Sequence, residues 1–124
     1  ENGFGSRLMV RGFLLNNQLT DFSAASQDEN GLTIANRVEG GKRPRSSMAP
    51  TLVFDEDREL LLAIGSPGGS RIIGYVTQAL INILDWEMNP QEAVSFPHYL
   101  SSNFGVELEQ GTPLESLSPN LVER

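Results

Sequence analysis

The stretch GKRPRSSMAPTLVF, residues 41–54, places two adjacent hydroxyl groups, those of Ser46 and Ser47, in a short basic loop directly before an apolar run. Pro44 and Pro50 restrict the backbone on either side of the pair, because the proline ring fixes φ. Two neighbouring Ser hydroxyls can donate hydrogen bonds to one carboxylate. The solvated flank of a hairpin would explain the same residues without any ligand.

A second candidate is the turn in IGSPGGSRII, residues 64–73, where an apolar strand ends and a helical pattern begins. The free N–H groups and the dipole at a helix start favour an anion. Gly68 and Gly69 have no side chains, so a phosphate, a carboxylate or the oxyanion of an acyl intermediate could approach their amides. Ser70-Arg71 stands where a P-loop would need Gly-Lys-Ser/Thr. A tight turn that simply requires glycine is the alternative interpretation.

A third candidate lies in LLNNQLTDFS, residues 14–23, where Gln18 and Asp21 follow an apolar run at a spacing of three. An amide and a carboxylate at this spacing could face one ligand, and a carboxylate suits an ammonium group. Ordinary turn chemistry would also explain these residues. His98 is the only histidine, and its surroundings indicate neither a Ser-His-Asp triad nor a metal site, so we expect no metal.

Composition excludes several classes of protein. The chain has 124 residues, with 9 basic and 16 acidic side chains and a net charge of −7, which argues against nucleic-acid binding. The basic cluster Lys42, Arg43 and Arg45 is too short to reverse this. No apolar run approaches the ~18 residues of a membrane span, and no signal segment begins the sequence. Without cysteine there is neither a disulfide framework nor thiolate chemistry.

Periodicity predicts an α+β fold, with mixed α/β as the other possibility. Thr112, Pro113 and Glu115 have the spacing of a helix cap and capping box. In the N-terminal half we expect one or two strands in 6–17 with an irregularity at Gly12, a long loop over 23–49, and a hairpin of 50–55 and 59–65. In the C-terminal half we expect a helix over 70–85, a short helix over 89–96 with Asn89 as its cap and Pro90 at its first position, a strand over 100–109, and a helix from Thr112.

Three segments, GFLLNNQLTDFS, GGKRPRSSMAPTLVF and GSPGGSRII, resemble the small subunit of gamma-glutamyltransferase (gamma-glutamyltranspeptidase) in the same order and at similar spacing. The resemblance extends from about Phe4 to about Gln110. It implies part of an Ntn-hydrolase αββα sandwich, a mainly antiparallel sheet with flanking helices. Such enzymes arise from a self-cleaving precursor and need no cofactor. An N-terminal Thr, activated by its own α-amine, takes the γ-glutamyl group of donors such as glutathione and passes it to water, amino acids or peptides.

The resemblance also implies roles for the three candidate sites. Gln18 and Asp21 would bind the α-amino group of the donor. Ser46 and Ser47 would hold its α-carboxylate, and the Gly68 and Gly69 amides would form the oxyanion hole. Glu1 stands where many members carry an Asn that assists amine binding.

Several parts of such an enzyme are missing from the sequence, which we expect to be an excised piece of the small subunit. The nucleophile would lie upstream of Glu1, since every Thr is internal: Thr20, Thr33, Thr51, Thr77 and Thr112. The large subunit and the C-terminal strands would also be absent. We therefore expect a catalytically silent piece that self-associates through uncovered apolar strands, from a parent that is periplasmic or extracellular.

Two other functions are compatible with the sequence. A related acylase would cleave glutaryl-type amides, but such substrates lack the α-amine that Asp21 would bind. A non-catalytic binding or structural domain would use Gly68-Gly69 only as a turn.

Overall fold

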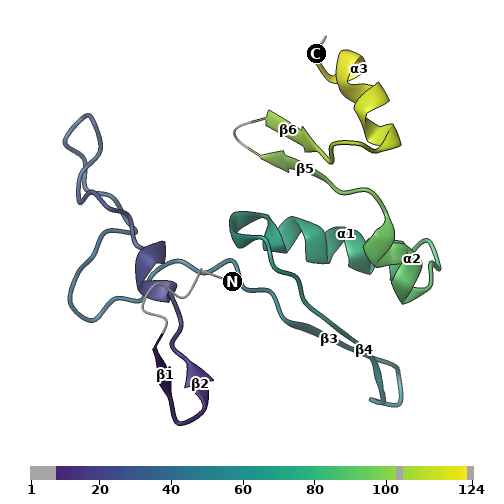
Figure 1. Ribbon diagram of the computed structural model, residues 1–124, viewed down its shortest axis with the longest axis horizontal. Helices are drawn as coiled ribbons and strands as arrows, with labels where there is room; N and C mark the ends of the chain where they lie inside the picture. Colours follow the sequence, from purple (N-terminus) through teal and green to yellow (C-terminus); the bar gives the residue numbers. More distant parts are fainter. Residues whose placement is uncertain (1–7, 103–104, 123–124) are drawn as a thin grey trace. The chain divides into compact units, whose positions relative to one another are not determined.

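The computed structural model describes residues 8–102 and 105–122. The chain divides into two compact units, Glu1–Ser46 and Ser47–Arg124. The described residues form short helices and three two-stranded antiparallel sheets (Figure 1). The α+β class is therefore confirmed.

The first unit begins with a small hairpin of β1 (Met9–Val10) and β2 (Phe13–Leu14). Arg11 and Gly12 connect the strands with φ values of +50° and +85°, as in the type I′ turns that suit two-residue hairpins. The expected irregularity at Gly12 is thus a reversal of the chain. The 3₁₀ helix η1 (Gln18–Asp21) follows the hairpin.

The predicted long loop is confirmed, and it folds back on itself. Isolated bridges join Ser23 to Arg37 and Gln27 to Thr33. At its tip the Asp28 carboxylate accepts hydrogen bonds from the backbone of Asn30 and Leu32, at 2.9 and 2.8 Å. No described residue of the first unit is fully buried, so hydrogen bonds rather than a core hold this loop.

The second unit begins with the predicted hairpin, formed by β3 (Thr51–Phe54) and β4 (Leu60–Ile64). The short 3₁₀ helix η2 (Gly69–Arg71) then leads into α1 (Ile72–Leu84). The next helix, α2 (Pro90–Ser95), has the predicted Asn89 cap: the Asn89 side chain accepts from the Glu92 amide at 2.9 Å, and Glu92 completes a capping box.

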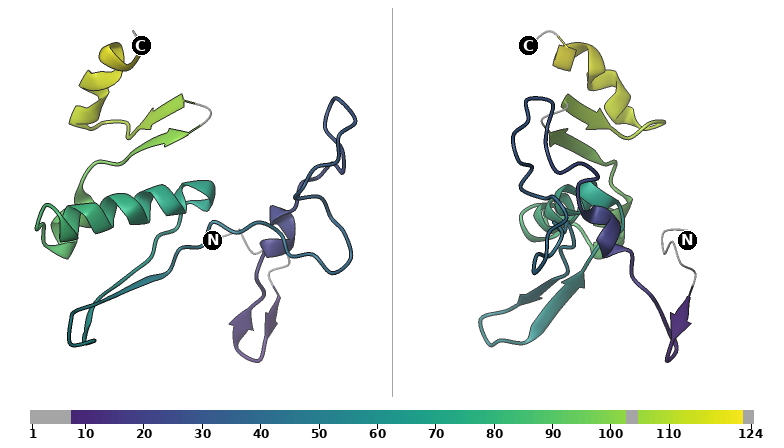
Figure 2. Two further views of the ribbon diagram at one scale, coloured as in Figure 1. Left: turned by 180° about the vertical axis from the view of Figure 1, so that it is seen from behind. Right: turned by 90° about the vertical axis from the view of Figure 1, so that its left-hand side faces the viewer.

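The small core of the second unit lies between α1 and α2, where Val76, Ala79 and Ala93 are buried. The β3–β4 hairpin extends from one side of α1, and the two strands that follow α2, β5 (Tyr99–Ser102) and β6 (Gly105–Leu108), lie on the other side (Figure 2). Gln78 of α1 is buried and links these elements: its Nε2 donates to the Pro97 carbonyl at 2.8 Å, and its Oε1 accepts from the Tyr99 amide at 3.4 Å.

Two expectations for the C-terminal third are wrong. The single strand over 100–109 is a hairpin of β5 (Tyr99–Ser102) and β6 (Gly105–Leu108), whose second strand starts at a Gly with φ of +115°. The capping box at Thr112 does not form. The Thr112 hydroxyl donates to the Glu109 carbonyl at 2.7 Å, and the Glu115 carboxylate accepts from the Gly111 amide at 2.9 Å.

The segment after this turn is also less regular than one helix. It is the 3₁₀ helix η3 (Pro113–Leu117) followed by the short α3 (Ser118–Val122). The segment begins in 3₁₀ geometry, in which the Glu115 amide donates to the Thr112 carbonyl at 3.2 Å, as is common at helix ends.

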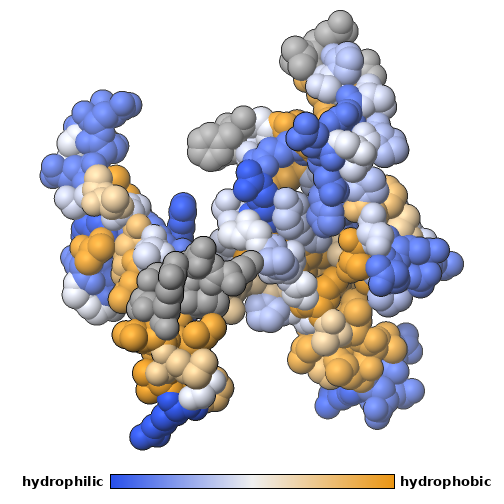
Figure 3. Space-filling view, in the orientation of Figure 1, coloured by the Kyte–Doolittle hydropathy of each residue, from blue (hydrophilic) through white to orange (hydrophobic). Residues whose placement is uncertain are grey.

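The β3–β4 hairpin carries the expected apolar surface (Figure 3). Leu52, Phe54, Leu60 and Leu61 are 53–61% exposed. No helix in the described residues has the length and apolar character to cross a membrane.

Candidate functional site

Gln18 and Asp21 form the first and last residues of η1. Side chains three apart are eclipsed in a 3₁₀ helix, so both start from one face of this turn. Both residues are half-buried. The Asp21 carboxylate has no hydrogen-bond or ion-pair partner among the described residues. The helix geometry thus starts this amide and this carboxylate from one face, and their binding of a common ligand stays a prediction.

Asn36 links this turn to the loop over residues 41–50 that carries Ser46 and Ser47, the serine loop. Asn36 was not identified from the sequence. Its Nδ2 donates to the Asp21 carbonyl at 2.7 Å and lies 3.5 Å from the Ser23 hydroxyl. Its Oδ1 accepts from the Arg45 amide at 2.9 Å, one residue before Ser46. These partners are 9 to 15 positions away in the sequence, so no local pattern could have revealed them.

The serine pair lies where the two units join: Ser46 ends the first and Ser47 begins the second. Ser46 is exposed and Ser47 half-buried. Of the nearby basic side chains, Lys42 is engaged within the loop, because its Nζ donates to the Ala35 carbonyl and lies 3.7 Å from the Glu39 carboxylate. Lys42 therefore serves the loop fold rather than standing open to a ligand.

Gly68 and Gly69 form the turn between β4 and α1. Their φ values are +133° and +58°, conformations that favour glycine. Both residues are exposed. Within the described part of the chain, no group accepts a hydrogen bond from either N–H, while the Gly68 carbonyl accepts from the Arg71 amide at 3.1 Å. Two adjacent donors are thus left available beside the start of a 13-residue helix, where the dipole favours negative charge.

Arg71 is the last residue of this turn, and its side chain forms an ion pair with Glu107. Its Nε donates to Glu107 Oε2 of β6 at 2.5 Å. This hydrogen bond, with the charge of Glu107, raises the pKa of Arg71 above its usual value. Arg71 therefore remains charged but is already paired.

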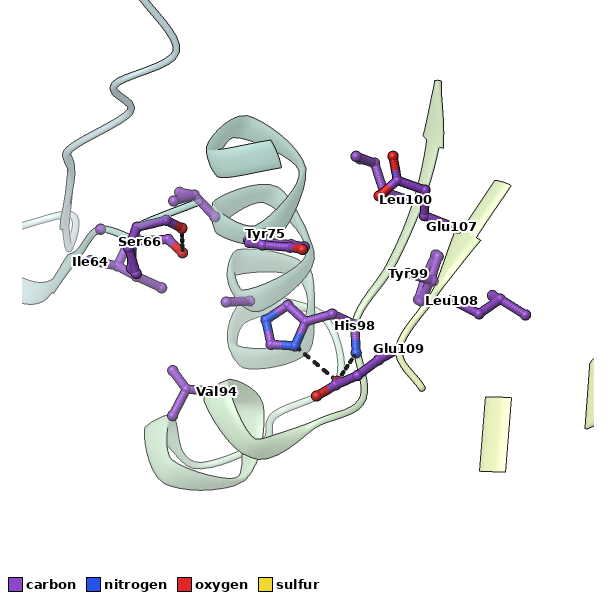
Figure 4. A pocket seen from close by; sticks show the side chains of 14 residues that line it. Ile64, Ser66, Tyr75, Val94, His98, Tyr99, Leu100, Glu107, Leu108 and Glu109 are labelled. Atoms are coloured by element: carbon purple, nitrogen blue, oxygen red, sulfur yellow. Dashed lines mark hydrogen bonds and ion pairs between the residues drawn. The ribbon is translucent and has the colours of Figure 1, made fainter. Parts of the chain in front are cut away.

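A pocket of about 510 Å³ lies beside the glycine turn, within the second unit (Figure 4). The side chains of Tyr75, His98 and Glu109 line it. The Tyr75 and His98 rings meet edge to face, with centroids 4.6 Å apart. The His98 amide donates to Glu109 Oε2 at 2.8 Å, and His98 Nδ1 is 3.4 Å from the same oxygen. The backbone hydrogen bond, more than the ring, lowers the pKa of Glu109.

The remaining expectations about ligating groups concern metals and Glu1. Across residues 8–102 and 105–122 no group of three or more His, Asp or Glu side chains could hold a metal ion. Glu1 lies outside the described residues. In the first unit Asn36 links Asp21 to Arg45, the residue before Ser46, and in the second unit the two glycine residues are exposed.

The sequence profile of the family described as gamma-glutamyltranspeptidase matches residues 1–124. The glutathione hydrolase proenzyme of Bacillus subtilis (strain 168) is 40% identical over 121 residues, which is 95% of this chain and 19% of the relative. That of Escherichia coli (strain K12) is 46% identical over 102 residues, 77% of this chain and 17% of the relative.

Solved structures show the same similarity. A mutant gamma-glutamyltranspeptidase of Helicobacter pylori is 40% identical, with a TM-score of 0.74 over 97% of this chain and 68% of the solved one. Since the curated relatives are matched over 19% and 17% of their own lengths, this chain spans less than a fifth of those proteins.

Proposed function

Because the chain belongs to the gamma-glutamyltranspeptidase family, we propose that it supplies the donor-binding and oxyanion-stabilising loops of a γ-glutamyl-transferring enzyme. The enzyme would take the γ-glutamyl group of glutathione and related compounds and pass it to water, amino acids or peptides. The large subunit of the same precursor would complete the active site.

The observation that carries this proposal is the glycine turn. Gly68 and Gly69 present two adjacent N–H groups that no described residue engages, beside the positive end of α1. When a nucleophile attacks the γ-carbonyl, its oxygen gains negative charge. Donors fixed beforehand stabilise that charge without reorganising during the reaction.

Recognition of the γ-glutamyl group would fall to the other two sites. The Asp21 carboxylate, which no described residue engages, suits the α-ammonium group, with Gln18 on the same face as a further hydrogen-bonding group. Ser46 and Ser47 would donate to the α-carboxylate. These contacts bind the end of the substrate that does not react, so they orient the γ-carbonyl for attack.

The nucleophile and the remaining framework would come from outside this sequence. An N-terminal Thr with a free α-amine would act as nucleophile and base, in a precursor that cleaves itself to expose it. We also propose that the three separate hairpins become parts of one αββα sandwich, and that the enzyme is periplasmic or extracellular, which cell fractionation would test.

The decisive experiment uses the complete enzyme and two anilides, γ-glutamyl and glutaryl, which differ by the α-amino group. The γ-glutamyl compound should be hydrolysed far faster. Asp21→Ala should raise its KM about 30- to 150-fold, since a lost charge-assisted contact costs about 2–3 kcal/mol. The control is Asp57→Ala, in the β3–β4 turn.

Two outcomes would contradict the proposal. Equal rates on both anilides, with Asp21→Ala unchanged, would indicate a glutaryl acylase. Hydrolysis of neither anilide would indicate a binding or structural domain.

A further inference from the structure

Gly68 is packed against an aromatic ring as well as held in a positive-φ conformation. A Cβ atom at Gly68 would lie 3.1 Å from Cε2 and 3.2 Å from Cδ2 of Tyr75, closer than side chains normally approach. The Tyr75 ring therefore covers the bare Cα of Gly68. Tyr75 belongs to α1, so the ring connects the turn to a regular helix.

The Tyr75 ring also contacts the ring of His98. The two rings lie at 78° to each other with centroids 4.6 Å apart, an edge-to-face contact of the kind that aromatic pairs prefer. Figure 4 shows Tyr75 on the helix with His98 and Glu109 beside it.

His98 is held by Glu109, and its two neighbours in the chain are held by Gln78. Glu109 accepts from its backbone amide at 2.8 Å and lies 3.4 Å from its Nδ1. The buried Gln78 side chain bonds the residues on both sides of it, at the Pro97 carbonyl and the Tyr99 amide. Gln78 follows Tyr75 by three positions on α1, so residues on one face of the helix contact the His98 ring and bond the backbone on either side of it.

We infer that Tyr75, supported by His98 and Glu109, is a positioning residue that holds the Gly68 amide in its donor geometry. This inference rests on the proposed function, because it gives the glycine turn its catalytic use. An oxyanion hole works only when its donors lie at hydrogen-bonding distance from the developing charge. A ring that stops the flexible glycine from leaving its positive-φ conformation would preserve that distance.

The test compares Tyr75→Ala, Tyr75→Phe and the matched control Tyr99→Ala in the complete enzyme. Tyr75→Ala should lower kcat on the γ-glutamyl anilide about 10- to 100-fold and leave KM near the wild-type value. Tyr75→Phe should restore kcat, since the ring and not the hydroxyl covers Gly68. Tyr99 also lines the pocket but does not cover Gly68, so Tyr99→Ala should leave kcat within about twofold.

A second measurement does not depend on activity. The Arg71 and Ile72 amides donate to the Gly68 and Gly69 carbonyls, so their hydrogen–deuterium exchange reports whether the turn keeps its conformation. Their exchange should rise in Tyr75→Ala and stay unchanged in Tyr75→Phe and Tyr99→Ala. Unchanged exchange in Tyr75→Ala would overturn the inference. So would a loss that appears in KM alone, or one that Tyr75→Phe shares. If exchange rises as expected but the wild-type enzyme cleaves no γ-glutamyl substrate, the positioning role stands and the proposed function fails.

Discussion

Replacing Asn36 should weaken donor binding although Asn36 is not among the predicted ligands. Its side chain makes two well-formed hydrogen bonds, to the Asp21 carbonyl at 2.7 Å and from the Arg45 amide at 2.9 Å. Each such bond stabilises by about 0.5–1.5 kcal/mol. Asn36→Ala therefore removes about 1–3 kcal/mol of hydrogen-bond stabilisation between η1 and the serine loop. If this is fully expressed in donor binding, KM should rise about 5- to 150-fold.

Two further variants make the assay selective. Asn36→Asp keeps the acceptor for the Arg45 amide, but it removes the donor and sets a carboxylate against the Asp21 carbonyl. It should disturb the η1 side alone. Asn30→Ala is the matched control. Asn30 lies in the same loop, and among the described residues it is bonded through its backbone amide alone, to Asp28.

Steady-state kinetics of the complete enzyme on a γ-glutamyl anilide give KM and kcat separately. The expected result is a raised KM, with kcat less affected, in both Asn36 variants and neither change in Asn30→Ala. If Asn36→Ala keeps the wild-type KM while Asp21→Ala raises it, the hydrogen bonds of Asn36 do not support the donor site.

Three further predictions concern acid stability, the serine pair and the isolated chain. Because the pKa of Glu109 is lowered, its carboxylate stabilises the fold at pH values above the ordinary pKa of a glutamate, and this stabilisation is lost as pH falls through the lowered pKa. The difference in melting temperature between the wild type and Glu109→Gln should therefore shrink on acidification from pH ~7 to ~3. Glu56 is an exposed turn residue, so the melting temperature of Glu56→Gln should match that of the wild type throughout. Changing both Ser46 and Ser47 to Ala should raise donor KM while leaving the melting temperature nearly unchanged, and a collapse of that temperature would mark the pair as structural. The 124-residue chain alone should release no aniline from a γ-glutamyl anilide above the buffer rate. Analytical ultracentrifugation should show that it self-associates through its exposed β3–β4 hairpin. Aniline release that a substitution within this chain abolishes would show that the nucleophile lies within the chain.

Local chemistry could be predicted wherever the interacting residues are close in sequence. The hairpin of β3 and β4, the helix α1 and the Asn89 cap of α2 all follow from patterns of two to four residues, because turns, caps and amphipathic faces are local effects. The three candidate sites were found in the same way, since each depends on neighbouring residues. Thr112 shows the limit of this approach: its spacing fits a capping box, but its hydroxyl bonds to Glu109 instead.

The sequence by itself determined the residue types of the site: two glycines before a helix, two serines in a rigid basic loop, and an amide and an acid three positions apart. Only the tertiary structure decided what holds them. Asn36 reaches Asp21 and Arg45, and Tyr75 covers Gly68 with His98 behind it. These supports join residues far apart in the chain, and long-range hydrogen bonds and ring contacts leave no period or spacing in a single sequence from which they could be inferred.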